Sequence, residues 1–233
     1  MGNKSSSRAL RLGISQDWDA DWYAEPRIFA QTLCEDVKIR EFIEKKLKAA
    51  GIARIAISRF RDCVELKINC LKPSVIVGRK GSEVDSISKS ISAMINKEVR
   101  LKVFDIKKPE LNATCVAKDV AFELQKKGVA CRRVIKRYVQ NCRRNGALGI
   151  RIECSGRLAG AEIARREWFQ EGAVPRQKFR ADIDYSSQKS YASWGICGVK
   201  VWIYKGDVIG KNSKKILVTN VGPAPAPRRM NNA

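Results

Sequence analysis

The segment Gly78-Arg79-Lys80-Gly81 has the composition of a phosphate-binding turn. Its glycines allow a sharp turn that exposes backbone N–H groups where a helical pattern begins, and N–H groups at a helix N-terminus attract phosphate. The two residues between the glycines are both cationic. In isolation an ordinary basic turn is the simpler interpretation, so the function of this loop depends on the elements that surround it.

A second group of cations lies on a helix predicted from Cys131 to Cys142 and just beyond it. Apolar residues recur on one side at three- and four-residue steps, which predicts a buried stripe. The cations on the other side are Arg132, Arg133, Lys136, Arg137, Arg143 and Arg144. A solvated basic face is the alternative, but six cations segregated on one side of one helix favour contact with RNA phosphates.

The whole chain carries excess positive charge. Its 233 residues include 46 Lys and Arg against 24 Asp and Glu, which gives a formal net charge of +22. A polyanion offsets self-repulsion of this size, so nucleic acid is the expected partner class. A membrane surface is the alternative, but no signal peptide or long apolar run is present, so we expect a cytosolic protein without a membrane partner.

Two residue types limit the available chemistry. The absence of histidine excludes histidine-based acid–base catalysis and every histidine-containing metal site. The eight cysteines show no Cys-Xaa-Xaa-Cys spacing and fall mostly at apolar positions, so we expect buried structural thiols. The sequence predicts no cofactor, no metal and no small-molecule substrate.

The loop is flanked by two predicted helices. A helical pattern runs from Arg27 to Ala50, where Gly51 ends it, and a second pattern follows the loop up to Ile95. The residues expected on the buried sides of the two helices are Phe29, Leu33, Val37, Ile43 and Leu47, then Val84, Ile87, Ile91, Met94 and Ile95.

Three segments alternate apolar and polar residues with the period of a strand: 52–59, 63–69 and 99–104. The resulting order is helix, strand, strand, loop, helix, strand. This order resembles a type II (prokaryotic) KH domain, in which a Gly-Xaa-Xaa-Gly loop clamps the backbone of single-stranded nucleic acid. The resemblance implies that all four residues of the loop bind RNA.

The C-terminal half predicts a second domain. Helical patterns cover 113–124 and 131–142, and period-two alternation predicts strands over 148–154, 179–185 and 199–204. The stretch 156–168 fits a helix and a strand equally well. We therefore expect an α+β protein, with a type II KH domain followed by a C-terminal α+β domain of two helices on an antiparallel sheet.

The expected organisation has four parts. They are an N-terminal extension over 1–26, the KH domain over 27–107, the C-terminal α+β domain over 108–206, and a basic, Pro- and Ala-rich disordered tail over 207–233. Within the extension, Trp18 and Trp22 are four residues apart, which predicts a packed helical turn; stacking on RNA is the alternative.

Three motifs of the C-terminal half are more specific than the loop: GRLAGAEIARREW from Gly156, RADIDY from Arg180, and GVKVWIYKG from Gly198. Together with the loop they resemble bacterial small-subunit ribosomal protein three, the KH-domain protein family of the ribosomal head, over nearly the whole chain. The resemblance implies a non-enzymatic constituent of the small (30S) subunit in the cytoplasm. It also implies binding to 16S rRNA, contact with the head proteins numbered ten and fourteen, and a share in the mRNA entry channel.

The same resemblance implies roles for individual cations. Arg132, Arg133 and Lys136 match the family's entry-channel residues, which are linked to the unwinding of structured mRNA. Further cations in or beside the family motifs are expected to contact rRNA or protein, namely Arg157, Arg165, Arg166, Arg176, Lys178 and Arg180. One departure from the family pattern is the sequence 176–179, Arg-Gln-Lys-Phe, where the family usually has Leu-His-Thr-Leu.

Two other functions fit parts of the sequence. A free-standing KH regulator explains the loop but gives no reason for the C-terminal motifs. A Mg²⁺-dependent nuclease could use Asp182 and Asp184, which share one face of a predicted strand, although such residues usually lie on a solvated strand edge beside Arg. The segment 206–212 is one residue short of a P-loop and lacks its Ser or Thr. We therefore expect no enzyme, and any unwinding of RNA would be passive.

Overall fold

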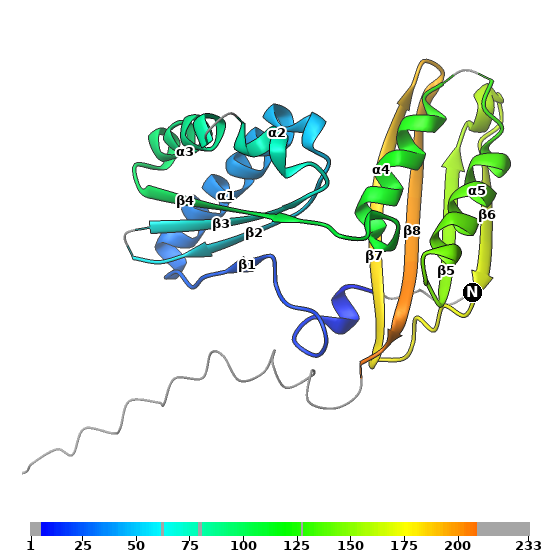
Figure 1. Cartoon of the computed structure of the whole chain (residues 1–233), viewed down its shortest axis with the longest axis horizontal. Coiled ribbons are helices and arrows are strands. Elements are labelled where there is room, and N and C mark those ends of the chain that lie inside the picture. Colours follow the sequence, from blue (N-terminus) through cyan, green and yellow to red (C-terminus); the bar gives the residue numbers. More distant parts are fainter. Residues whose placement is uncertain (1–5, 62, 79–80, 127, 209–233) are drawn as a thin grey trace, which may run out of the picture.

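Two four-stranded sheets, each covered by helices on one side, form the described part of the chain (Figure 1). The computed structural model describes residues 6–61, 63–78, 81–126 and 128–208. The predicted α+β class is confirmed. The tail expected beyond 206 lies, from residue 209 onward, outside the described residues.

The first sheet has the strand order β1-β2-β3-β4. β2 pairs antiparallel with β3, while β1 and β4 add parallel strands at the two edges. The elements of this half are β1 (Ala20–Asp21), α1 (Pro26–Lys46), β2 (Ile52–Arg59), β3 (Cys63–Cys70), α2 (Pro73–Val77), α3 (Ser82–Ile95) and β4 (Glu98–Asp105). The order helix, strand, strand, loop, helix, strand is the one predicted for a KH domain.

The buried side of α1 differs from the predicted one. Phe29, Leu33 and Val37 were expected in the core, yet each remains 46–48% exposed. Ile43 and, just after the helix, Leu47 are buried as predicted, and Ile39 joins them in the core. On α3, the predicted stripe is buried at Ile87, Ile91 and Ile95, whereas Met94 is exposed.

A buried polar cluster explains this rotation of α1. Arg59 at the end of β2 is almost enclosed and pairs with Asp36 (2.6 Å) and Glu35 (2.7 Å). Trp22 donates its indole N–H to the same Asp36 carboxylate at 2.7 Å. Because a buried guanidinium requires charged partners, the acidic side of α1 turns inward and the apolar residues beside it turn outward.

The helical turn predicted around Trp18 and Trp22 is wrong. The intervening residues Ala20 and Asp21 form β1, which extends the first sheet beside β2. Trp18 is 57% exposed, while Trp22 packs its ring 5.4 Å from that of Phe29. The backbone N–H of Ile57 bonds to the carbonyl of Asp19, and this pairing fixes the segment as an extended strand.

The second sheet is fully antiparallel, with the strand order β6-β5-β8-β7. The elements of this half are α4 (Ala113–Leu124), α5 (Cys131–Arg144), β5 (Gly149–Gly156), β6 (Arg165–Gly172), β7 (Ala181–Ala192) and β8 (Gly195–Asp207). The ambiguous stretch 156–168 contains a short 3-10 turn, Leu158–Gly160, and the start of β6, an edge strand of the sheet.

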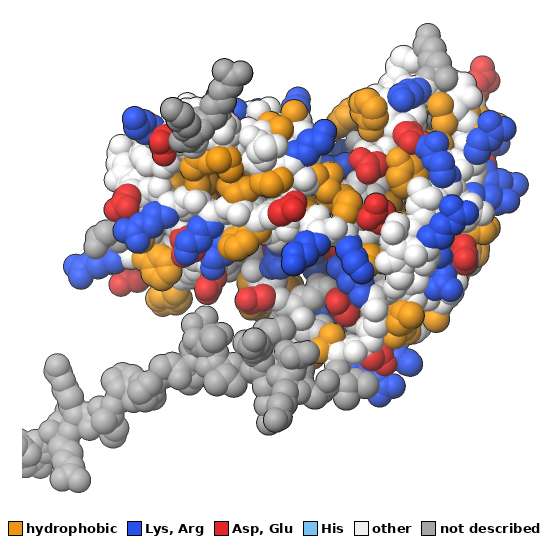
Figure 2. Space-filling view, in the orientation of Figure 1, with side chains coloured by type: hydrophobic (Ala, Val, Ile, Leu, Met, Phe, Trp, Pro, Cys, Tyr) orange, Lys and Arg blue, Asp and Glu red, His pale blue; other side chains and the backbone are white. Residues whose placement is uncertain are grey.

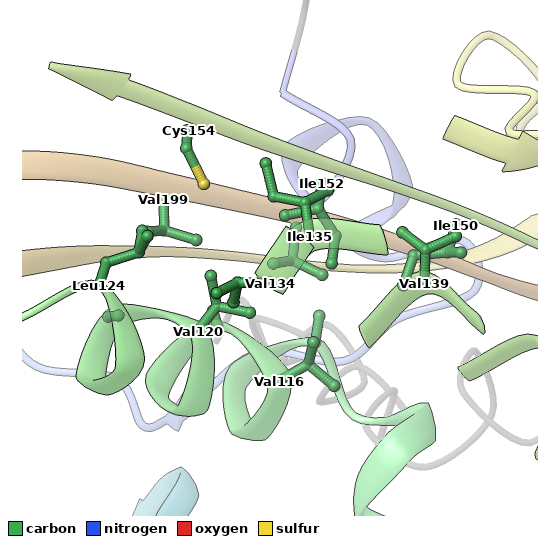
Figure 3. Packing of buried hydrophobic residues seen from close by; sticks show 14 of the residues in the cluster. Val116, Val120, Leu124, Val134, Ile135, Val139, Ile150, Ile152, Cys154 and Val199 are labelled. Atoms are coloured by element: carbon green, nitrogen blue, oxygen red, sulfur yellow. The ribbon is translucent and has the colours of Figure 1, made fainter. Parts of the chain in front are cut away.

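The core of this half lies between the two helices and the central strands (Figure 3). Val116, Val120 and Leu124 project from α4 toward the strands, and residues of α5 pack beside them. Asn112 begins α4 by accepting hydrogen bonds from the N–H groups of Thr114 and Cys115. The apolar sides predicted for these helices and strands therefore meet in the core, with the two helices in one layer and the sheet in the other.

Most cysteines are buried among apolar residues. Six of the eight are buried, and all eight are free thiols, as predicted. Burial raises the pKa of Cys142 to about 12 and that of Cys115 to about 11, so both thiols remain protonated at neutral pH. Cys34 on α1 is exposed.

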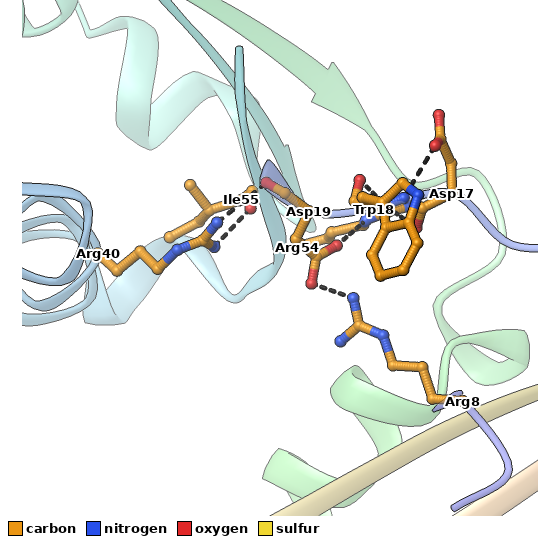
Figure 4. A network of polar contacts seen from close by, with 7 residues as sticks. All are labelled: Arg8, Asp17, Trp18, Asp19, Arg40, Arg54 and Ile55. Atoms are coloured by element: carbon orange, nitrogen blue, oxygen red, sulfur yellow. Dashed lines mark hydrogen bonds and ion pairs between the residues drawn. The ribbon is translucent and has the colours of Figure 1, made fainter. Parts of the chain in front are cut away.

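The N-terminal segment crosses from one half of the molecule to the other. On the KH side, Asp19 pairs with Arg54 at 2.6 Å and with Arg8, and Arg54 also donates to the carbonyl of Asp17 at 2.9 Å (Figure 4). On the other side, the buried Arg11 side chain enters the C-terminal half. The segment thus holds the two sheets together, beside a direct bond from Lys118 Nζ to the carbonyl of Ile52 (2.6 Å).

Candidate nucleic-acid interface

Helix α5 is amphipathic in the manner predicted. Its inner side is buried against β5 and β6, with Val134, Ile135 and Val139 each at most 3% exposed. The outer side carries the cations. In Figure 2, Lys and Arg side chains gather along the outer edge of the C-terminal half, where Figure 1 places α5 and β6.

The six cations of α5 divide into two groups. Arg137 pairs with Glu123 of α4, and Arg143 donates to the carbonyl of Ala147 at 2.6 Å. Within the described ranges no acidic side chain pairs with the remaining four, which are all exposed: Arg132, Arg133, Lys136 and Arg144. These charges are the ones best placed to neutralise an external polyanion.

A groove of about 400 Å³ runs between the N-terminal half of α5 and strand β6. The cations Arg132, Lys136 and Arg166 line it together with the aromatic residues Trp168 and Phe169. The ammonium of Lys136 lies 5.7 Å from the ring centre of Phe169. The sequence did not indicate this groove, because the stretch 156–168 fitted a helix as well as a strand.

Three cations of the first C-terminal motif are held by contacts within the chain. Arg157 donates to the carbonyls of Ala161 (2.9 Å) and Trp194 (3.1 Å), which fixes the turn before β6. Arg165 pairs with Glu167 at 3.4 Å, and Arg166 pairs with Glu153 at 2.5 Å. Arg165 and Arg166 remain exposed at the sheet edge, whereas Arg157 is half-buried and positions the loop.

The charge of Glu153 is stabilised despite its burial. Burial acts to raise the pKa of this carboxyl. Hydrogen bonds and ion pairs with Arg166 and Arg151 lower the pKa by more than burial raises it, so the net shift is downward. Glu153 is therefore ionised at neutral pH and anchors two guanidinium groups on the sheet.

The last three predicted cations lie at the other edge of the sheet. Arg176 places its guanidinium 5.4 Å from the ring centre of Trp202, and Arg180 pairs with Asp207 at 2.9 Å. Lys178 is exposed. Because β7 and β6 are opposite edges of the sheet, these cations form no single patch with the groove beside α5.

The KH loop is described only at its two glycines. Gly78 ends α2 with φ 66° and ψ −166°, and Gly81 precedes α3 with φ 85°. Arg79 and Lys80 lie outside the described residues, so their predicted RNA contact remains a prediction. A Cβ atom on Gly78 would lie 2.5 Å from Cγ of Glu83, so the turn is packed against the first turn of α3.

Replacing Gly78 by alanine is expected to destabilise the chain by about 2 kcal/mol, because the left-handed φ and the close side chain both oppose a Cβ atom. Urea unfolding of the full chain measures this change. Gly81→Ala is the matched control: its φ is also positive, but nothing lies within 4 Å of its added Cβ. We expect a loss of about 1 kcal/mol there, and equal losses at both glycines would contradict the packing argument.

Asp184, one of the two carboxylates considered for a metal, is engaged by groups within the chain. Asp184 accepts a hydrogen bond from the N–H of Ala113 at the start of α4 (3.0 Å) and pairs with Lys205 (3.4 Å). Because β7 is an edge strand and the Asp184 side chain is 27% exposed, the arrangement agrees with the expected charged strand edge, with Lys205 as the cationic partner in place of Arg. Among the described residues, no group of three or more Cys, Asp or Glu side chains is arranged to hold a metal ion.

Comparison with known proteins gives two family matches and many close relatives. Residues 120–203 match the family model described as ribosomal protein S3, C-terminal domain, and residues 38–111 match the KH domain. A protein of Desulforamulus reducens named small ribosomal subunit protein uS3 is 47% identical over 92% of this chain and 96% of its own length. The chain belongs to the uS3 family.

Other uS3 proteins show the same coverage. The protein of Persephonella marina is 44% identical over 93% of this chain and 96% of its own, and that of a Ruegeria species is 42% identical over 97% and 95%. Membership in this ribosomal family also confirms the prediction that the chain is not an enzyme. No helix in the described ranges is long and apolar enough to cross a membrane.

Proposed function

We propose that this chain, a structural constituent of the small ribosomal subunit in the cytoplasm, lies in the head of that subunit, binds 16S rRNA and helps to form the mRNA entry channel. The observation that carries the proposal is the outer side of α5. Arg132, Arg133 and Lys136 are exposed there without an acidic partner in the described part of the chain. Such cations gain their counterion when an RNA backbone lies against them.

Two of these cations, Arg132 and Lys136, line the groove between α5 and β6, and this position supports the channel role. Single-stranded RNA is flexible and presents its phosphates to a row of cations more readily than a rigid duplex does. Any unwinding would therefore be passive: the protein retains strands that have already separated. No nucleotide hydrolysis is involved.

The KH half contributes two further contacts in this proposal. Gly78 and Gly81 place the loop at the start of α3, where N–H groups of a helix N-terminus attract phosphate, and RNA contact by Arg79 and Lys80 is part of the proposal. The exposed apolar residues of α1, which include Phe29, Leu33 and Val37, form the kind of face that another protein covers. The partners proposed for this face are the head proteins numbered ten and fourteen.

Sedimentation of a lysate in a sucrose gradient, with the protein detected by antibody, tests the ribosomal role. We expect near-stoichiometric comigration with the small subunit that survives a high-salt wash, since a structural constituent is held by many simultaneous contacts. Protein that stays at the top of the gradient would contradict the proposal and would favour a free-standing KH regulator.

A further inference from the structure

Trp168 is an exposed aromatic residue beside the basic groove. It lies on edge strand β6 and is 56% exposed. Its ring does not rest on apolar neighbours alone, because the guanidinium of Arg151 lies 4.3 Å from the ring centre. This distance is well inside the range of cation–π contact.

The support beneath Trp168 is largely buried in the sheet. The Arg151 side chain is only 12% exposed and lies 3.4 Å from Glu153, which is itself buried. On its other side, Arg151 approaches the ring of the buried Trp202 at 6.0 Å. Arg151 thus stands between two indole rings on the side of the sheet away from the helices, and Trp168 forms the exposed end of this stack.

The surroundings of Trp168 are cationic and concave. It lines the groove of about 400 Å³ together with Arg132, Lys136 and Arg166. The one acidic residue of the groove, Glu167, is paired with Arg165 at 3.4 Å, so its charge is offset. An exposed aromatic ring bordered by cations is the arrangement that binds single-stranded nucleic acid, because the ring stacks on a base while the cations bind the adjacent phosphates.

We propose that Trp168 is a stacking platform for an unpaired RNA base. Arg166, on the same face of β6, binds the adjacent phosphate, and Arg132 and Lys136 bind phosphates farther along the RNA, where it passes round the sheet edge into the groove. This inference rests on the proposed function and names the state of the RNA that the site selects. A base within a duplex is already stacked on its neighbours and cannot reach Trp168. The site therefore retains single strands, which supplies a physical cause for passive unwinding.

Binding of short RNA to the full-length chain tests the proposal. The probe is a single-stranded oligonucleotide that contains one 2-aminopurine, whose fluorescence is quenched by stacking. With Trp168→Leu we expect affinity to fall about tenfold and most of the quenching to disappear, whereas Trp168→Phe retains both. Tyr191→Leu is the matched control, because Tyr191 is 64% exposed on the opposite edge strand, β7. It is expected to behave as the wild type.

A triple variant of α5 and a photo-cross-link to β6 separate loss of base stacking from loss of RNA binding. The triple variant Arg132→Ala, Arg133→Ala, Lys136→Ala is assayed with the same oligonucleotide and with a duplex. If it weakens binding while Trp168→Leu changes neither affinity nor quenching, base stacking is overturned and the proposed RNA contact stands. If the triple variant also binds as the wild type, the proposed contact itself fails. Should Trp168→Leu not fold, a photo-cross-link from a 4-thiouridine oligonucleotide to residues 165–172 of the wild type supports the proposal, and its absence overturns it.

Discussion

Replacing Arg11 by alanine is expected to destabilise the protein by about 3–5 kcal/mol. The Arg11 side chain is fully buried, and every hydrogen bond that its guanidinium donates within the described ranges goes to a backbone carbonyl. The acceptors are the carbonyls of Ala181 (2.5 Å), Ser7 (2.7 Å), Lys178 (2.7 Å), Arg176 (3.2 Å) and Pro175 (3.4 Å). Removing the guanidinium leaves these carbonyls without this donor and weakens the attachment of the N-terminal segment to the second sheet, where Gln16 still donates to the carbonyl of Ile183 (3.0 Å).

Urea unfolding of the full chain measures the effect, and Arg8→Ala is its control. Arg8 belongs to the same segment, but its side chain is 43% exposed and its pairing with Asp19 lies at the surface. We expect Arg8→Ala to cost about 1 kcal/mol or less. Arg11→Lys retains the charge but loses the planar fork of donors, so it should fall between the two. If Arg11→Ala lowered the free energy of unfolding by less than about 1 kcal/mol, Arg11 would not be what attaches the N-terminal segment to the second sheet.

The second large effect is on RNA binding. Replacing Arg132, Arg133 and Lys136 together by alanine should weaken the binding of single-stranded RNA about 100-fold, at roughly 1 kcal/mol for each lost phosphate contact. The slope of log K against log salt concentration should also become less negative by about 2, because each phosphate contact to a single strand contributes about −0.7 to that slope. Filter binding across a series of salt concentrations measures both quantities.

The control for this triple variant removes three positive charges from another part of the chain. Lys38, Lys45 and Lys48 are exposed cations at α1 and just after it, so their joint replacement by alanine also lowers the net charge by three. We expect at most a few-fold loss of affinity from this variant. Equal losses for the two triple variants would mean that overall charge, rather than the face of α5, determines binding.

Much of the fold follows from periodicity alone. The alternation over 52–59 and 63–69 gave antiparallel neighbours, and the apolar side of α5 is the buried one. These predictions succeeded because one face of each element meets the core and the other meets solvent, so the pattern of residues carries the orientation.

The predictions that failed share one physical cause: they depended on contacts between residues far apart in the sequence. Arg59 determines which side of α1 turns inward, although it lies 23 residues from Asp36. Periodicity within α1 contains no information about that partner. The groove beside α5 was missed for a similar reason, since Trp168 and Lys136 become neighbours only when β6 takes its place at the sheet edge.

A cryo-electron microscopy structure of the native small subunit with a bound messenger would test the central claim most directly. The account predicts this chain in the head, with Arg132, Arg133 and Lys136 within about 4 Å of RNA phosphate oxygens. A particle in which the outer side of α5 faces solvent or protein, with none of these three cations touching RNA, would contradict it.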